Sequence, residues 1–388
     1  MRYYLENNFV LKRLETPALY GIQEDELYEL DETAFEFLRK CSRPEGCSAD
    51  GAGKEFIEYC LSEKILSDTS SPTLRRPESL PGSSAFPSLR YLELQITDRC
   101  NLKCRHCYID KPGQNELSPE VIKDILCEFD SMQGLRLLIT GGEPLLHRSF
   151  GAINDLLPGH GFRKILFTNG LLLEKMAITE LNVDEIQFSV DGMEHGHDAL
   201  RGSGSYNMVM HAIKAAIAAG KAASVSTMVH RENTGEFAEM ERLFKDMDIR
   251  DWTVDVPCLT GNLKQNATLN LPPEVAGPFL NYGFGGGLHG GGEGYACGLH
   301  LLSVLANGAV SKCAFYGRSP LGTVSEGLRK CWERLKPVKL EELECARLDC
   351  KFMDACRGGC RYRASIADNE SGPRKRDIYK CFAYGIIE

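Results

Sequence analysis

The sequence predicts an α/β protein whose central part is a partial (β/α)6, TIM-like barrel. Three observations support this fold class. Six short apolar segments between residues 91 and 256 alternate with helix-like stretches, which is the pattern of a parallel sheet. Residues 1–68 and 297–388 lack that alternation, so they are expected to form two smaller domains. A cysteine-rich loop directly follows the first strand, at the end of the strands where barrels carry their functional residues.

The first 68 residues are predicted to form a domain of short strands and two helices. The pieces "RYYL", "FVLKRL" and "ALYGI" are typical of strands broken by polar turns. The stretch "YELDETAFEFLRKC" predicts a helix that begins after an N-cap at Asp31, and "KEFIEYCLSEKIL" predicts a second helix. Residues 69–90 are rich in proline and serine, which indicates a linker.

The barrel is expected to occupy residues 91–258. Between its strands, "SPEVIKDILCEFDSM" and "YNMVMHAIKAAIAAG" predict the clearest helices, and the second ends at Gly220. Residues 259–296, with the glycine-rich run "GFGGGLHGGGEG", are expected to bridge the barrel and the last domain. The predicted strands are 91–97, 135–140, 164–168, 185–190, 224–229 and 252–256.

The composition excludes some classes of function. The 388 residues carry a formal charge of −9, so no basic field for nucleic acid or an anionic membrane is present. Neither a signal peptide nor an apolar run long enough to span a bilayer is found, which favours a soluble protein of the cytoplasm. Sixteen cysteines in that reducing compartment indicate metal binding or catalysis rather than a disulfide framework.

The stretch "ITDRCNLKCRHCYID" places Cys100, Cys104 and Cys107 on one loop, with spacings of three and then two residues. Three thiolates can hold three irons of a cubane [4Fe–4S] cluster and leave the fourth iron open to a small molecule. A zinc site or a packing cluster of cysteines is the alternative, although a closed zinc site uses four ligands.

At this loop the sequence resembles the radical S-adenosylmethionine (SAM) superfamily, whose signature is C-x3-C-x2-C with an aromatic residue before the last cysteine. His106 stands at that aromatic position. The resemblance implies that the open iron binds the amino and carboxylate groups of SAM. It also implies that one electron cleaves the sulfonium to give a 5′-deoxyadenosyl radical, so catalysis would rest on the cluster at Cys100, Cys104 and Cys107.

Further motifs at the strand ends extend the resemblance over residues 91–258. "TGGEP" looks like the motif for the amino group of SAM, with Gly141 and Gly142 permitting close approach and Glu143 accepting from the ammonium. "FSVDG" resembles the region that contacts ribose and carboxylate, through Ser189 and Asp191. "FTNG" is also similar to the family. Arg201 could pair with the SAM carboxylate or could be a solvated surface charge.

The C-terminal cysteines form a second group that resembles a SPASM domain, the extension that carries two auxiliary iron–sulfur clusters. "CGLHLLSVLANGAVSKC" is C-x10-G-x4-C, and "CARLDCKFMDACRGGC" is C-x4-C-x5-C-x3-C, where the family has x2 between the first pair. The resemblance assigns Cys297, Cys313 and Cys360 to a proximal cluster. It assigns the distal cluster to Cys345, Cys350, Cys356 and Cys381.

Two points in this region stay open at the level of sequence. The fourth proximal ligand is Cys258, Cys331 or no protein residue, with a slight preference for an open iron. A zinc ribbon is the alternative to the clusters, since closely spaced cysteines also bind zinc. Ala314 stands where sulfatase maturases have an aspartate after the matching cysteine, so that activity is disfavoured.

The N-terminal residues resemble the winged-helix-like peptide chaperone of the pyrroloquinoline-quinone pathway, known as a RiPP recognition element. This implies a precursor peptide whose leader adds to a sheet edge. The hypothesis is a radical SAM peptide maturase that installs a thioether or carbon–carbon crosslink, with flavodoxin or ferredoxin as electron donor. A tetrapyrrole or other small-molecule substrate is the second interpretation, and a non-enzymatic, peptide-binding electron carrier is the third.

Overall fold

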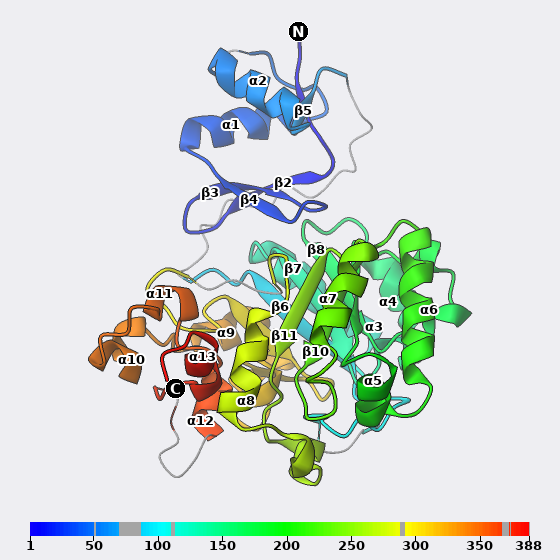
Figure 1. Cartoon of the computed structure of the whole chain (residues 1–388). Coiled ribbons are helices and arrows are strands. Elements are labelled where there is room, and N and C mark those ends of the chain that lie inside the picture. Colours follow the sequence, from blue (N-terminus) through cyan, green and yellow to red (C-terminus); the bar gives the residue numbers. More distant parts are fainter. Residues whose placement is uncertain are drawn as a thin grey trace.

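The computed structural model describes residues 1–49, 52–69, 87–109, 113–287, 292–366, 372 and 374–387. Most of the predicted linker at 69–90, and residues 288–291 of the glycine-rich run, lie outside these ranges. Figure 1 shows a small N-terminal domain standing on a larger α/β body, with the C-terminal helices on one side of that body.

The larger body contains the predicted parallel sheet. Its six strands run in the order β11-β10-β9-β8-β7-β6, and every neighbouring pair is parallel. Each predicted strand is confirmed to within two residues, because the apolar segments are long enough to fill both buried faces. The strands are β6 (Tyr91–Thr97), β7 (Arg136–Gly141), β8 (Arg163–Thr168), β9 (Glu185–Ser189), β10 (Ala222–Met228) and β11 (Asp251–Asp255).

The sheet continues beyond β6 into residues that the sequence placed in the C-terminal domain. Strand β12 (Leu301–Val304) pairs in parallel with β6, and Leu301 lies opposite Tyr91. Strands β13 (Ala309–Ser311) and β14 (Gly322–Thr323) follow as an antiparallel edge. In the described part of the chain the sheet therefore stays open, with β11 at one edge and β14 at the other.

Helices pack on the sheet and on its C-terminal extension (Figure 1). Ser118 caps the first of them by accepting from the Val121 N–H at 3.4 Å, and Gly220 adopts φ +74° after α6, as its position predicted. The helices are α3 (Pro119–Ser131), α4 (Phe150–Leu156), α5 (Glu194–Arg201), α6 (Ser205–Ala218), α7 (Phe237–Asp246), α8 (Pro273–Ala276), α9 (Leu328–Glu333), α10 (Glu344–Arg347), α11 (Met353–Cys356), α12 (Arg361–Ile366) and α13 (Ile378–Ala383).

The N-terminal domain combines a three-stranded antiparallel sheet with the two helices that the sequence predicted. The Asp31 carboxylate caps the first helix by accepting from the Ala34 N–H at 2.7 Å. In the sheet order β2-β3-β4, strand β4 is an edge strand. The elements are β1 (Tyr4–Leu5), β2 (Phe9–Arg13), β3 (Pro17–Gly21), β4 (Glu26–Glu29), α1 (Glu32–Cys41), α2 (Lys54–Ser62) and β5 (Leu66–Ser67), with β1 paired to β5.

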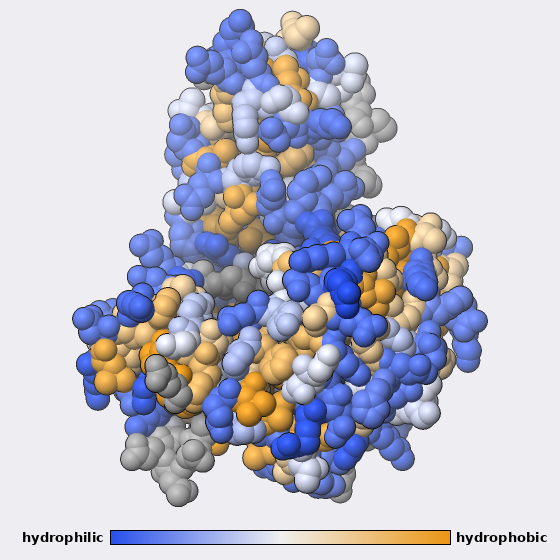
Figure 2. Space-filling view, viewed as in Figure 1, coloured by the Kyte–Doolittle hydropathy of each residue, from blue (hydrophilic) through white to orange (hydrophobic). Residues whose placement is uncertain are grey.

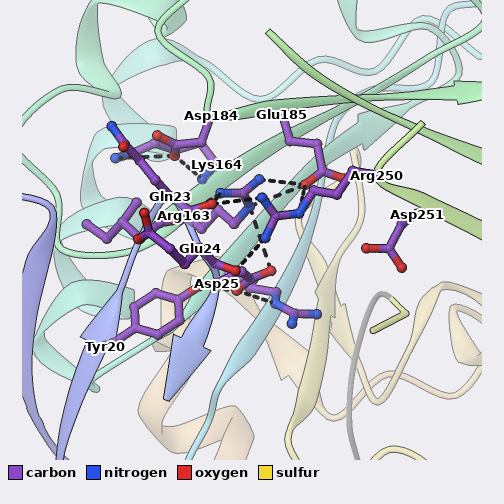
Figure 3. Close-up of polar contacts among 12 residues, drawn as sticks. Tyr20, Gln23, Glu24, Asp25, Arg163, Lys164, Asp184, Glu185, Arg250 and Asp251 are labelled. Atoms are coloured by element: carbon purple, nitrogen blue, oxygen red, sulfur yellow. Dashed lines mark hydrogen bonds and ion pairs between the residues drawn. The ribbon is translucent and has the colours of Figure 1, made fainter. Parts of the chain in front are cut away.

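A buried ionic network joins the two parts at the amino ends of the barrel strands (Figure 3). Arg163, which begins β8, donates to the carbonyls of Ile22 at 2.6 Å and Gln23 at 2.8 Å. The same guanidinium pairs with Glu185 at 2.7 Å, and the two side chains are only 1% and 5% exposed. The N-terminal domain is therefore fixed at the end of the sheet opposite to the cysteine loop, which follows β6.

Among the described residues, none of the helices combines the length and the apolar character that a membrane span requires.

Candidate functional site

The three-cysteine loop lies at the carboxyl end of β6 and is held there by the segment that contains Gly261 and Asn262. The Asn262 N–H donates to the Cys107 carbonyl at 2.9 Å, and the Asn262 side chain donates to the Cys104 carbonyl at 3.1 Å. Gly261 has φ +53°, and a Cβ there would lie 2.2 Å from the Cys107 carbonyl oxygen. Only glycine permits this close approach, so residue 261 helps to shape the loop.

Hydrogen-bond donors face the sulfur atoms of the loop. The Leu102 N–H donates to Cys100 Sγ at 3.4 Å, and Arg201 Nη1 donates to Cys104 Sγ at 3.8 Å. Burial raises the pKa of the Cys100 thiol to about 11, and the neighbouring Cys104 and Cys107 add to this rise. N–H donors and a guanidinium beside neighbouring thiols match the surroundings that iron–sulfur thiolates require.

The ligand geometry differs from that of a mononuclear metal site. In the described part of the chain, no three Cys, His, Asp or Glu side chains converge on one point that could hold a single metal ion. In a cubane, by contrast, each thiolate binds a different iron, so its ligands need not converge. The donor set at Cys100, Cys104 and Cys107 therefore fits a [4Fe–4S] cluster.

The "TGGEP" motif packs directly against the start of the cysteine loop. A Cβ on Gly141 would lie 2.4 Å from the Thr97 carbonyl oxygen, and one on Gly142 would lie 2.3 Å from that of Arg99. The Gly142 N–H donates to Thr97 at 2.8 Å. The two glycines thus let their backbone pack against the carbonyls of Thr97 and Arg99, and this packing sets the position of the cysteine loop.

Glu143 is fully buried behind these glycines. Its carboxylate accepts from Thr168 Oγ1 at 2.9 Å, from the Asn169 N–H at 2.9 Å and from the Leu145 N–H at 3.2 Å. Burial raises the pKa of Glu143 to about 7, although these hydrogen bonds oppose the rise. Glu143 therefore ties the ends of β7 and β8 together, and its predicted contact with the SAM ammonium remains a prediction.

Asp191 and Arg201 form a buried ion pair beside the cysteine loop. Arg201 Nε lies 2.5 Å from Asp191 Oδ2, and the two side chains are 11% and 0% exposed. Burial alone would raise the pKa of the Asp191 carboxyl, but the Arg201 guanidinium outweighs it and holds the pKa well below its usual range. The alternative of a solvated surface charge at Arg201 is therefore wrong. Ser189 ends β9, opposite Ser226 of β10.

Two buried histidine nitrogens near this pair have no hydrogen-bond partner. They are His106 Nδ1 and His197 Nε2. Burial lowers the pKa of both rings to about 4, so both are neutral at pH 7. His197 Nδ1 accepts from the Asp191 N–H at 3.2 Å, which leaves Nε2 as a buried donor. Unsatisfied polar atoms at the mouth of the sheet fit a polar ligand such as SAM.

The residue His197 and a row of aromatic rings were missed at the level of sequence. Tyr108 follows Cys107 directly, and its ring lies 5.1 Å from that of Phe315. Phe315 stacks in turn on Tyr362 at 5.1 Å. These rings connect the cysteine loop with the segments that carry Cys313 and Cys360. Their positions next to cysteines were the only available signal, because rings far apart in sequence show no pattern.

The structure brings the C-terminal cysteines into two groups. Cys345, Cys350, Cys356 and Cys381 line one cavity of about 360 Å³, and their binding of a distal cluster stays a prediction. In the predicted proximal group, burial raises the pKa of Cys313, and Cys297 and Cys360 are near enough to add to the rise. Four thiols around one cavity fit a cluster with four thiolate ligands. Figure 2 shows hydrophobic side chains near this C-terminal part of the surface, framed by hydrophilic ones.

Residues 94–244 match the family model described as "Radical SAM superfamily". The match begins inside β6 and ends in α7, so it contains the cysteine loop, the "TGGEP" motif and the Asp191–Arg201 pair. The chain outside these residues is not part of the match.

Two curated relatives illustrate the range of similar sequences. An "AdoMet-dependent heme synthase" of Oleidesulfovibrio alaskensis is 26% identical over 55% of this chain and 56% of its own length. The "Mycofactocin maturase MftC" of Mycobacterium tuberculosis is 33% identical over 39% of this chain and 41% of its own length. The chain thus spans about half the length of these two curated relatives.

The solved structures extend the likeness to the whole fold. SuiB of Streptococcus suis, bound to the precursor peptide SuiA, has a TM-score of 0.65 and covers 98% of this chain and 100% of its own. SuiB bound to S-adenosylmethionine gives a TM-score of 0.66 over 97% of this chain and 99% of its own. The sequence identity is 16% in both cases, so the likeness establishes the fold, including the N-terminal and C-terminal parts.

Proposed function

We propose that this chain is a radical SAM peptide maturase that abstracts a hydrogen atom from a ribosomally made peptide, because residues 94–244 match the family model of the radical SAM superfamily. The observation that carries the proposal is the combination of parts. A domain with a free strand edge is fixed to a sheet whose opposite end holds three cysteines on one loop. The product would contain a thioether or carbon–carbon crosslink.

The cofactors supply the radical chemistry, and the side chains of this chain would hold and orient them. When bound, a [4Fe–4S] cluster and S-adenosylmethionine supply one-electron cleavage of the sulfonium and hence a 5′-deoxyadenosyl radical. Cys100, Cys104 and Cys107 would hold the cluster. Arg201, which is paired with Asp191, lies against Cys104 Sγ and would offer positive charge at the thiolate. Ser189, His106 and His197 would supply polar partners to SAM.

The leader of the precursor peptide would add to strand β4. Of the two edges of the N-terminal sheet, β2 already faces the barrel, because the Arg13 N–H donates to Gln133 Oε1 at 3.2 Å. Strand β4 is paired only with β3 among the described strands. A peptide strand at β4 would use main-chain hydrogen bonds for affinity and would raise the local concentration of the core peptide.

The auxiliary sites and the cellular setting follow from the same proposal. Cys297, Cys313 and Cys360 would hold a proximal cluster, and the four cysteines of the C-terminal cavity would hold a distal one. A flavodoxin or ferredoxin would supply the electrons. Reduced thiols and such clusters need a reducing compartment, which supports the cytoplasm.

A tetrapyrrole substrate is the second candidate, and one observation favours it. Besides the heme synthase, an "Fe-coproporphyrin III synthase" of Methanosarcina barkeri is 23% identical over 69% of this chain and 82% of its own length. The maturase proposal is preferred because it gives the N-terminal domain a role.

The test is an anaerobic assay of the reconstituted, reduced enzyme with SAM. We expect 5′-deoxyadenosine in the assay, and we expect a precursor peptide encoded beside this gene to lose the mass of two hydrogen atoms on crosslinking. Absence of 5′-deoxyadenosine with full iron loading would contradict radical chemistry. Turnover of a porphyrin in place of every tested peptide would support the second candidate.

A further inference from the structure

The end of strand β11 meets the segment that carries Cys360. Cys258 lies three residues beyond the end of β11 and is 5% exposed. Its thiol shares a hydrogen bond with the thiol of Cys360, although the two residues lie 102 positions apart in the sequence. A buried thiol in contact with a partly buried one, from distant segments of a chain without disulfides among its cysteines, suggests a shared ligand.

A buried ionic network holds the two segments together. The guanidinium of Arg363, in α12, donates to the Val256 carbonyl at 3.0 Å and pairs with Asp255 at 2.8 Å. On its other side it pairs with Asp377 at 2.7 Å, and this carboxylate also accepts from the Cys360 N–H at 2.8 Å. Arg363 and Asp377 are 4% and 2% exposed. The contact between the thiols is thus fixed by buried side chains on both sides.

Two further thiols stand near the same point. The Cys297 thiol lies near enough to the Cys360 thiol for the two to interact electrostatically. Cys313 lies within reach of both Cys297 and Cys360. Four thiols from four segments therefore surround one region of the interior.

Cys331, the other candidate for the fourth proximal ligand, lies apart from these four thiols. Cys331 is fully buried in α9, where its thiol faces the Thr323 carbonyl at 3.6 Å. A Cβ on Gly322 would lie 2.7 Å from its sulfur, so Cys331 packs against strand β14. Its charged neighbours are Glu326, Arg334 and Glu128, and none of the four thiols described above is among them.

We propose that Cys258 is the fourth protein ligand of the auxiliary iron–sulfur cluster held by Cys297, Cys313 and Cys360. The inference rests on the proposed function only in that this cluster is present. It replaces the slight preference for an open iron that was stated from the sequence alone. A cluster with four thiolates has no vacant iron for substrate, so its role would be to transfer electrons.

The test compares Cys258→Ala with Cys331→Ala, both made in a chain whose Cys100, Cys104 and Cys107 are changed to alanine. That background removes the SAM cluster, so iron, sulfide and electron paramagnetic resonance spectra report the auxiliary clusters alone. We expect Cys258→Ala to lose iron to a chelator at least about tenfold faster than the background chain, since even outer partners of metal ligands affect affinity by that factor. Added cyanide should change its spectrum by binding the opened iron. Cys331→Ala should match the background in both measurements.

A second variant guards against a loss of folding. Cys258→Ser keeps a weaker ligand of nearly the same size, so we expect retained iron with a shifted spectrum. Identical spectra, chelator rates and cyanide responses for the Cys258 and Cys331 variants would overturn the assignment. If the background chain holds no iron and sulfide at all, the auxiliary clusters of the proposed function fail instead, and the two failures are thereby distinguished.

Discussion

At the scale of single residues, the Asp191–Arg201 pair gives the clearest prediction. Arg201→Gln removes the guanidinium and leaves a carboxylate that is 0% exposed without its cation. Breaking a buried ion pair in this way costs about 3–5 kcal/mol. We expect a large fall in the midpoint of thermal unfolding, measured by circular dichroism under anaerobic conditions.

The matched control for that variant is an exposed arginine. Arg148 pairs with Glu116 at 3.5 Å, and its side chain is 69% exposed. Surface pairs contribute at most about 1 kcal/mol, so Arg148→Gln should barely change the midpoint. Equal midpoints for the two variants would mean that Asp191 is solvated in solution.

At the scale of elements, Glu15 connects the turn between β2 and β3 with the segment entering β6. Its carboxylate accepts from the Ser88 N–H at 2.7 Å and from Arg90 Nη2 at 2.7 Å. Burial would raise the pKa of Glu15, but these contacts outweigh it and lower the pKa from 4.5 to about 2. A lowered pKa means that the contact stabilises the fold above pH 4.5, and that this stabilisation disappears as the pH falls toward 2.

We therefore expect the cofactor-free wild-type chain to lose stability over this acidic range more steeply than Glu15→Gln. Between the ends of this pH range, the free energy of unfolding of the wild type should fall by about 3 kcal/mol more, at most, than that of Glu15→Gln. Urea unfolding at a series of pH values measures it. Glu55→Gln, at an exposed position of α2, should follow the wild type. A Glu15→Gln curve parallel to the wild-type curve would contradict the assigned contact.

The same scale shows what the sequence could predict. The six parallel strands and the helices α3 and α6 were found because their apolar pattern and caps are local signals. Strands β12, β13 and β14 were not, because two to four residues are too few to show a pattern. For the same reason the predicted boundary at residue 297 falls next to a strand that belongs to the main sheet.

The features of the candidate site also separate into those that are local in sequence, which could be predicted, and those that join distant segments, which could not. Motifs confined to a few residues, such as the cysteine loop and "TGGEP", could be read directly. Contacts between distant segments could not, since neither the Cys258–Cys360 contact nor the Tyr108–Phe315 stack leaves a periodic trace. Arg201 was ambiguous for this reason, because its burial depends on the packing of α5 against the cysteine loop.

At the scale of the whole molecule, Arg163 fixes the N-terminal domain to the barrel. Arg163→Met removes the ion pair with Glu185 and the hydrogen bonds to Ile22 and Gln23. A buried partner left alone costs about 3–5 kcal/mol, so we expect the domain to detach on mild heating. Limited proteolysis between the domains should become faster, and small-angle X-ray scattering should show a larger radius of gyration.

A control exists within the same network. Arg250 donates to the Gln23 carbonyl at 2.9 Å, but its side chain is 33% exposed and lies 4.0 Å from Glu185. Arg250→Met should therefore have a much smaller effect on proteolysis. If both variants remain as compact and as resistant as the wild type, the apolar contacts at Leu14, Ile22 and Leu135 hold the domains together without the ions.

The placement of the domains also limits the substrate of the proposed maturase. The leader would bind at the amino ends of the strands, whereas the radical would form at their carboxyl ends. Strand β6 has seven residues, so these ends are about 20 Å apart at ~3.3 Å per residue. An extended peptide bound at both places therefore needs a spacer of at least about six residues.

A series of precursor peptides with shortened spacers, followed by mass spectrometry, tests this length. The yield of modified peptide should fall sharply below about six spacer residues. It should change little above that length, since effective concentration declines slowly with added length. Full modification of a peptide with only two or three spacer residues would mean that the leader leaves β4 before the reaction.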